Sequence, residues 1–80
     1  MGTARTHRDQ QREDTRRQIV AAAMHAFAEG GFDGTSTRGI AERAGVTQGL
    51  VTYHFASKAE LWRSAVDAVF AALAKGADAD

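Results

Sequence analysis

The stretch that decides the fold runs from Thr37 to Phe55 and reads TRGIAERAGVTQGLVTYHF. Its first half carries a narrow apolar stripe, because Ile40, Ala41 and Ala44 recur at the one-, three- and four-residue spacings of a helix face. Thr37 is the predicted N-cap of this first helix. Its side-chain oxygen can accept hydrogen bonds from the free backbone N–H groups of the first turn.

The second half of the stretch predicts another short helix after a glycine turn. Gly45 is the predicted stop of the first helix, because a C-terminal cap usually needs a positive φ and glycine has no Cβ to clash. Thr47 is the predicted N-cap of a second helix over residues 48–54, which turns Val51 and Phe55 inward. This order is the helix-turn-helix pattern, whose second helix can enter the major groove of DNA.

At these residues the chain resembles the DNA-binding domain of TetR-type transcriptional regulators. The similarity covers roughly residues 15–70, and its combined spacing is specific although any short piece of it would be weak. The resemblance implies an all-α fold, a small helical bundle with a homeodomain-like helix-turn-helix of the TetR N-terminal type and four helices, the last one truncated. The matching positions are Ile19, Ala23, Phe27, Gly31-Phe32, Thr35-Ser36-Thr37, Ile40-Ala41, Ala44-Gly45-Val46, Gly49, Tyr53-His54-Phe55 and Ser57-Lys58.

The residues before this stretch divide into a polar arm and a helix. Residues 1–13 are polar without an apolar period and predict a disordered basic arm, whose arginines would either lie on phosphates or remain solvated. A first helix is predicted from Asp14 to Glu29, with Arg16 and Arg17 in its first turns. Its core face is formed by Ile19, Ala23, Ala26 and Phe27, widened by Val20 and Met24. Ala26 stands where the family usually has a leucine.

The segment GGFDGTST, residues 30–37, is predicted to be a turn rather than a phosphate loop. Gly30 and Gly31 end the first helix, Phe32 is expected to fold back onto the core, and Asp33-Gly34 favours a turn. The segment lacks the lysine and the preceding apolar strand that a phosphate-binding loop needs.

The last helix is predicted to start at Ser57, with Glu60 completing a capping box. It carries two apolar stripes and therefore needs two partners; the stripes are Leu61, Ala65, Val69, Leu73 and Trp62, Val66, Phe70. One partner is the first helix, and the second is expected to be missing. We therefore expect a DNA-binding domain at residues 14–75, with the helix-turn-helix motif at about 36–55. In the family a C-terminal ligand and dimerisation domain follows, and we expect it to be absent from this chain, which would be a fragment or a truncated product.

Composition excludes several classes of protein. The 80 residues predict one domain without cysteine, which excludes disulfides and thiolate metal sites. No apolar run approaches the ~20 residues that span a bilayer, and no secretory signal is present, so a cytoplasmic location is expected. Net charge is zero, yet basic and acidic segments alternate along the chain, so one face can be basic.

The predicted DNA contacts lie on the second helix of the motif and at the starts of its neighbours. They are Thr37, Arg38, Thr47, Gln48, Gly49, Leu50, Thr52, Tyr53, His54 and Lys58. Gln48 is the best base reader, because an amide can pair bidentately with adenine. Gly49 would let the backbone approach DNA closely, and Lys58 would contact phosphate. Thr52 departs from the family, where many relatives carry an aromatic residue.

Each of these contacts has a structural alternative. Tyr53 could be half-buried packing, His54 a helix cap, Leu50 a core residue and Arg38 a solvated charge. Metal binding by His54 is not expected, because His7 and His25 lie on other elements and no carboxylate has ligand spacing with it.

The sequence thus predicts sequence-specific binding of double-stranded DNA by a TetR-like regulator, most often a repressor, that reads a palindromic operator. A homodimer is expected in the full-length family member and weak or absent dimerisation here. An inducer would act only through the missing domain. The alternative is a small interaction or dimerisation module that uses the exposed apolar face of the last helix. No enzyme activity, cofactor, metal or membrane partner is expected.

Overall fold

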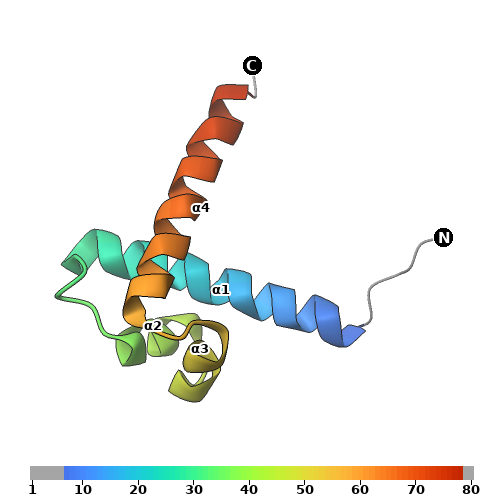
Figure 1. The fold of residues 1–80 in the computed structure, drawn as a ribbon, viewed down its shortest axis with the longest axis vertical. Coiled ribbons are helices and arrows are strands. Elements are labelled where there is room, and N and C mark those ends of the chain that lie inside the picture. The colour runs from blue at the N-terminus through green and yellow to red at the C-terminus, as the bar shows by residue number, and fades with distance from the viewer. Residues whose placement is uncertain (1–6, 79–80) are drawn as a thin grey trace.

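A computed structural model describes the backbone of residues 7–78 and the side chains of residues 10–76. This part of the chain forms four helices and no strand, in the order α1 (His7–Gly30), α2 (Thr37–Ala44), α3 (Gln48–His54) and α4 (Lys58–Asp78). Helix α1 packs against both α2 and α4, and α2 packs against α3. Figure 1 shows α1 and α4 crossing, with α2 and α3 together on one side of the crossing. The all-α prediction is therefore confirmed.

The core draws one large side chain from each helix. Ile19, Ile40, Val51 and Leu61 are the largest fully buried residues, and they come from α1, α2, α3 and α4 respectively. Burying one such side chain is worth about 1.5–3 kcal/mol. Val51 and Phe55, predicted to face inward, are 0% and 3% exposed. The short α3 is consequently held by tertiary packing rather than by its own helical propensity.

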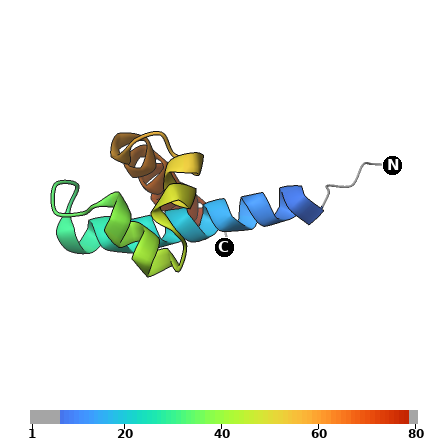
Figure 2. The same cartoon turned by 90° about the horizontal axis from the view of Figure 1, so that it is seen from below.

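Helix α1 begins earlier than predicted. Residues 7–13 were expected in the disordered arm, but α1 starts at His7, so Arg16 and Arg17 lie in its middle rather than its first turns. Extending a helix that the core has already nucleated adds a hydrogen bond per residue, so a polar segment can follow. Arg17 adds ion pairs at helical spacing to Glu13 (3.8 Å) and Asp14 (3.6 Å). Residues 1–6 of the predicted arm lie outside the described residues. Figure 2 shows the first turns of α1 extending past the other helices.

The segment between α1 and α2 folds back onto the core, as predicted. Gly31 ends α1 with a φ of 74°, and residues 31–34 form a turn. Phe32 stacks on Phe27 at 6.1 Å between ring centroids and meets Trp62 edge-on at 5.6 Å. The hydroxyl of the buried Thr35 shares its one proton between two carbonyls at the end of α1, those of Ala26 (3.1 Å) and Gly31 (2.8 Å). Ala26 itself, predicted on the core face, is only partly buried.

The start of α4 is capped largely as predicted. The Ser57 hydroxyl accepts from the Glu60 backbone N–H at 3.1 Å, while the Glu60 carboxylate accepts from the Ala56 N–H at 3.3 Å, one residue earlier than a capping box requires. None of the helices in the described region is long and apolar enough to span a bilayer.

Neither of the two apolar stripes predicted on α4 is buried along its whole length. In the first, Leu61 and Ala65 are buried, whereas Val69 and Leu73 are 40% and 65% exposed. In the second, Trp62 rests against Phe27 at 4.9 Å between centroids instead of facing a missing partner. The stripes are split along the helix because α1 crosses only its first half, and the second half projects away from the other helices (Figure 1).

Candidate nucleic-acid interface

The first helix of the motif is capped by Ser36 rather than by the predicted Thr37. Ser36 has extended backbone angles (φ -115°, ψ 155°), and its hydroxyl accepts from the Gly39 N–H at 3.0 Å. Thr37 is the first residue inside α2. Either hydroxyl is chemically able to cap, and the path of the preceding loop puts Ser36 at the boundary. The Thr37 hydroxyl is thereby available to another partner.

The turn between α2 and α3 has the predicted glycine stop. Gly45 adopts φ 76° and ψ 28°, and its N–H donates to the Glu42 carbonyl at 3.2 Å. The N–H of Val46 donates to the Ala41 carbonyl at 3.0 Å. This pair of bonds is a Schellman motif, which satisfies carbonyls that have no partner within the helix.

Helix α3 has the predicted bounds and cap. The Thr47 hydroxyl accepts from the Leu50 N–H at 3.2 Å, and α3 then runs over Gln48–His54. Because Val51 and Phe55 anchor one side, the other side is left in solvent. The residues on it that are exposed are Gln48, Gly49, Thr52 and Tyr53, with Thr47 just before them. Leu50 and His54 are half-buried.

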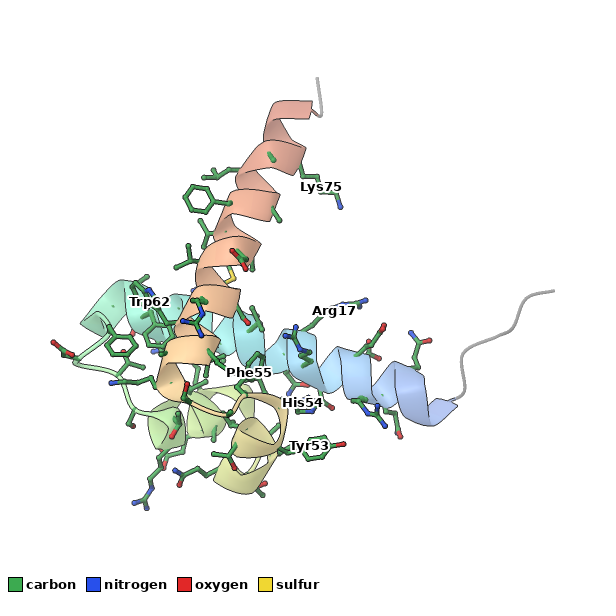
Figure 3. The ribbon with its side chains drawn as sticks, in the orientation of Figure 1. Arg17, Tyr53, His54, Phe55, Trp62 and Lys75 are labelled. Atoms are coloured by element: carbon green, nitrogen blue, oxygen red, sulfur yellow. The ribbon has the colours of Figure 1, made fainter. Side chains whose placement is uncertain are left out.

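Tyr53 is the most informative of these side chains. It is 68% exposed, and Figure 3 shows it extending from α3 on the side away from α2. The alternative that Tyr53 is half-buried packing is therefore wrong. Its ring meets His54 edge-on, with 5.1 Å between centroids, so the two aromatic groups form one feature at the end of α3.

The predicted contacts on the three helices of this surface lie close together. The Gln48 amide donates to the Thr37 hydroxyl at 3.3 Å, which joins the first turns of α3 and α2. An open groove of about 570 Å³ is lined by Thr37, Thr52 and Lys58, among others. The Thr52 hydroxyl donates back into its own helix and shares its one proton between the carbonyls of Gln48 (3.3 Å) and Gly49 (3.1 Å).

Lys58, the expected phosphate contact of α4, is turned toward the loop between α1 and α2. Its ammonium donates to the carbonyls of Phe32 (2.7 Å) and Thr35 (3.0 Å). The same nitrogen lies 4.3 Å from the centroid of the Phe32 ring, a cation–π distance. Two of its three N–H donors are thus used inside the protein.

Two arginines of α1 lie beside the end of α3, a placement that the sequence did not predict. The Arg16 guanidinium is 4.8 Å from the centroid of the Phe55 ring. Partial burial lowers the pKa of His54 below its ordinary value, and the positive charges of Arg16 and Arg12 lower it further. The four-residue spacing of Arg12 and Arg16 would have indicated a shared helix face if α1 had been extended to His7. Figure 3 shows His54 and Phe55 next to α1.

Other basic side chains near the motif are paired. Arg43 donates to both carboxylate oxygens of Glu29, at 2.6 Å and 3.3 Å, and this hydrogen bonding lowers the pKa of Glu29. Arg38 lies 3.8 Å from Glu42 across one turn of α2, and both side chains are exposed. In the described part of the chain, no group of three or more histidine, cysteine, aspartate or glutamate residues is arranged to hold a metal ion.

The helix-turn-helix part of this surface lies in a region that matches a known family. Residues 19–65 match the family model described as bacterial regulatory proteins, tetR family. The match covers more than half of the 80 residues and includes all of α2 and α3. The chain belongs to the tetR family. Its helix-turn-helix, α2 and α3, lies entirely within the residues that the family model matches.

Curated relatives support the same assignment. The HTH-type transcriptional regulator TtgR of Pseudomonas putida is 44% identical over 57 residues, which are 71% of this chain and 27% of TtgR. The HTH-type transcriptional activator FasR of Mycolicibacterium smegmatis is 37% identical over 51 residues, 64% of this chain and 23% of FasR. The HTH-type transcriptional repressor AcnR of Corynebacterium efficiens is 33% identical over 49 residues, 61% of this chain and 26% of AcnR. This TetR-family chain thus spans about a quarter of the length of these relatives. No solved structure matches it significantly.

Proposed function

We propose that this chain binds double-stranded DNA sequence-specifically, with α3 in the major groove, as the DNA-binding domain of a TetR-type transcription regulator. The observation that carries the proposal is the two-sided character of α3. Val51 and Phe55 are buried at 0% and 3% exposure, while Tyr53 on the opposite side is 68% exposed. A helix anchored from behind presents its polar side in a fixed orientation, as a recognition helix requires.

Within this surface Gln48 is assigned to base reading. Its amide is exposed and is held by the Thr37 hydroxyl at 3.3 Å, so its orientation is partly set before DNA arrives. An amide can pair bidentately with the N6 and N7 atoms of adenine. Gly49 follows it without a side chain and permits a close approach of the backbone. Leu50 is assigned to contact with a thymine methyl group.

The remaining residues are assigned to phosphates, which set the register of a protein on DNA without reading sequence. From α2 these are Thr37 and Arg38, from α3 they are Thr52, Tyr53 and His54, and Thr47 is the N-cap just before α3. Arg12 and Arg16 add positive charge at the far end of α3, where the groove wall would pass. This charge supports the proposal, although the net charge of the whole chain is zero.

We further propose that the full regulator acts as a homodimeric repressor on a palindromic operator. A two-fold dimer would read two half-sites and exclude polymerase from the site it occupies. One relative is named a repressor and another an activator, so the sign of regulation needs its own measurement. A reporter assay tests the sign of regulation. The operator, once recovered by DNA selection, is placed within a reporter promoter and the regulator is expressed. Reduced transcription supports repression, and increased transcription contradicts it.

Selection of DNA from a random pool tests the principal proposal. The chain is fused to a dimerising domain, and the recovered duplexes are then titrated by fluorescence anisotropy. We expect a palindromic consensus and affinity that falls steeply with salt, because cationic side chains release counterions from phosphates. Recovery of no consensus, or binding that is insensitive to salt, would contradict the proposal.

Gln48→Ala separates base reading from general affinity. It should reduce discrimination at one or two positions of each half-site by about 1–3 kcal/mol, the value of a bidentate contact. Gln11→Ala removes an exposed amide from α1 and is the matched control, for which the consensus should not change. If Gln48→Ala and Gln11→Ala show the same base preference at every position of the half-site, Gln48 does not read bases.

A second candidate function rests on the exposed side of α4. Val69, Phe70 and Leu73 are 40%, 65% and 65% exposed, and a groove of about 170 Å³ beside them is lined by Trp62 and Val66. Such a face can bind another apolar surface. Sedimentation velocity over a range of concentrations tests self-association. A sedimentation coefficient that does not change with concentration would argue against it.

A further inference from the structure

Lys58 occupies the first position of α4, but its charge lies against the loop that precedes α2. The ammonium donates to the carbonyls of Phe32 (2.7 Å) and Thr35 (3.0 Å) and lies 4.3 Å from the centroid of the Phe32 ring. The two carbonyls converge because the Thr35 N–H itself donates to the Phe32 carbonyl, at 3.4 Å. A single ammonium therefore satisfies both peptide groups and covers one face of the ring.

The residues that Lys58 holds are those that lead into α2. Thr35 is directly followed by Ser36, the N-cap, and by Thr37, the first helical residue. On its other side Thr35 is tied to the end of α1, since its hydroxyl donates to the Ala26 and Gly31 carbonyls. The loop thus has one set of bonds to α1, through Thr35, and one to α4, through Lys58. Removing the second set would leave the loop before α2 without its hydrogen bonds to α4, and only those to the end of α1 would remain.

We propose that Lys58 is a positioning residue, which fixes the first turn of α2 against α4 and thereby the orientation of Ser36 and Thr37. This assignment replaces the phosphate contact that the sequence predicted for Lys58. Its DNA-binding part rests on the proposed function, whereas its effect on the loop and on folding does not.

The two roles make opposite predictions for Lys58→Met, which keeps the aliphatic stem and removes the donors. As a positioning residue, Lys58 makes charge-assisted hydrogen bonds to two carbonyls, and their loss should raise the unfolding constant about tenfold or more. Amide hydrogen exchange at residues 35–39 should accelerate. Affinity for the selected duplex should fall several-fold, while the slope of log K against log salt stays the same. As a phosphate ligand, Lys58 would instead lower that slope by about one with no change in unfolding or exchange.

Two further variants complete the experiment on the 80-residue chain. Lys58→Arg retains a cation with several donors and should restore most of the stability and the slow exchange. Arg38→Met is the matched control, since it removes an exposed charge from the first turn of α2 without touching the loop carbonyls. It should lower the salt slope and leave unfolding unchanged.

The unfolding, hydrogen-exchange and salt measurements distinguish a positioning role of Lys58 from a phosphate contact. Unchanged unfolding and loop exchange in Lys58→Met, together with a lower salt slope, would overturn the positioning role in favour of a phosphate contact. If Lys58→Met does not fold, Lys58→Arg decides: recovered folding supports the carbonyl contacts, and failure of both variants overturns them. If no variant binds DNA, the proposed function fails, while the unfolding and exchange measurements still test Lys58.

Discussion

The side-chain amide of Gln18 donates a 2.6 Å hydrogen bond to the carbonyl oxygen of Ala44, which joins the middle of α1 to the last residue of α2. The last carbonyls of a helix have no partner within it. The Schellman bonds at Gly45 satisfy the carbonyls of Ala41 and Glu42, and Gln18 satisfies that of Ala44. Helix α1 therefore holds the turn from which α3 departs.

Replacing Gln18 by methionine removes this bond and keeps a side chain of similar length. We expect the free energy of unfolding to fall by about 1 kcal/mol or slightly more, because the partly buried carbonyl of Ala44 loses its partner. Urea denaturation followed by circular dichroism measures the change. Gln10→Met alters an exposed glutamine of the same helix and should change stability by less than ~0.5 kcal/mol. Equal effects of the two substitutions would show that the bond contributes nothing.

Replacing Gly49 of α3 by alanine should change stability in the opposite direction from replacing Gly45 of the turn. A Cβ added at Gly49 would meet nothing closer than the Thr47 hydroxyl oxygen at 4.0 Å, so Gly49→Ala should raise stability by up to ~1 kcal/mol. Affinity for DNA should nevertheless fall, because the added methyl group would lie between the α3 backbone and the base pairs. Unfolding and anisotropy measured on the same sample test both halves of this prediction.

Gly45→Ala is the comparison for stability, because it makes the same substitution at a glycine with a positive φ. Gly45 has a φ of 76°, where a Cβ costs about 1–2 kcal/mol, so this variant should be less stable. A Gly49→Ala variant that binds DNA as well as the parent chain would contradict the close approach of the backbone.

Protonation of His54 should make stability depend on pH. Burial, together with Arg16 and Arg12, lowers the pKa of His54 below the 6.5 of an unperturbed histidine. The unfolded chain then binds a proton more readily than the folded one, so stability is fully present above about pH 6.5. The contribution of His54 to stability is lost as the pH falls from about 6.5 through the lowered pKa of His54. Urea midpoints between pH 5 and pH 8 should show this decline.

His54→Gln should flatten the decline, whereas His25→Gln, at an exposed site on α1, should not. DNA phosphates would stabilise the protonated form, so the parent chain should also bind DNA more tightly at pH 6 than at pH 8. The same pH profile in the parent and in His54→Gln would remove His54 as its source.

Two aromatic residues of α4 that share a predicted stripe should differ in their contribution to folding. Trp62 contacts the rings of Phe27 and Phe32 and is 37% exposed, so Trp62→Ala should cost about 2–3 kcal/mol, less than a fully buried tryptophan. Phe70 is 65% exposed, and Phe70→Ala should change stability by less than ~0.5 kcal/mol. Thermal and urea unfolding compare them. If Phe70→Ala proves as costly as Trp62→Ala, the projecting half of α4 is packed in solution.

The sequence by itself determined the local features of the helix-turn-helix. The stop at Gly45, the cap at Thr47, the bounds of α3 and the inward side chains of Val51 and Phe55 were all predicted, and each is confirmed. These features depend on φ angles, on hydrogen bonds that reach only a few residues along the chain, and on the three- and four-residue spacing of a helix face. Such relationships can be recognised without knowing where the other helices lie.

Only the tertiary structure decided which distant groups meet. Whether Ser36 or Thr37 caps α2 depends on the loop before it, in which Thr35 is bonded both to Ala26 of α1 and to Lys58 of α4. The placement of Arg16 beside Phe55, and of Lys58 on the Phe32 carbonyl 26 residues away, likewise follows from how α1 and α4 cross. A long cationic side chain can face either solvent or a carbonyl. The choice depends on which acceptors the packed helices bring within its reach.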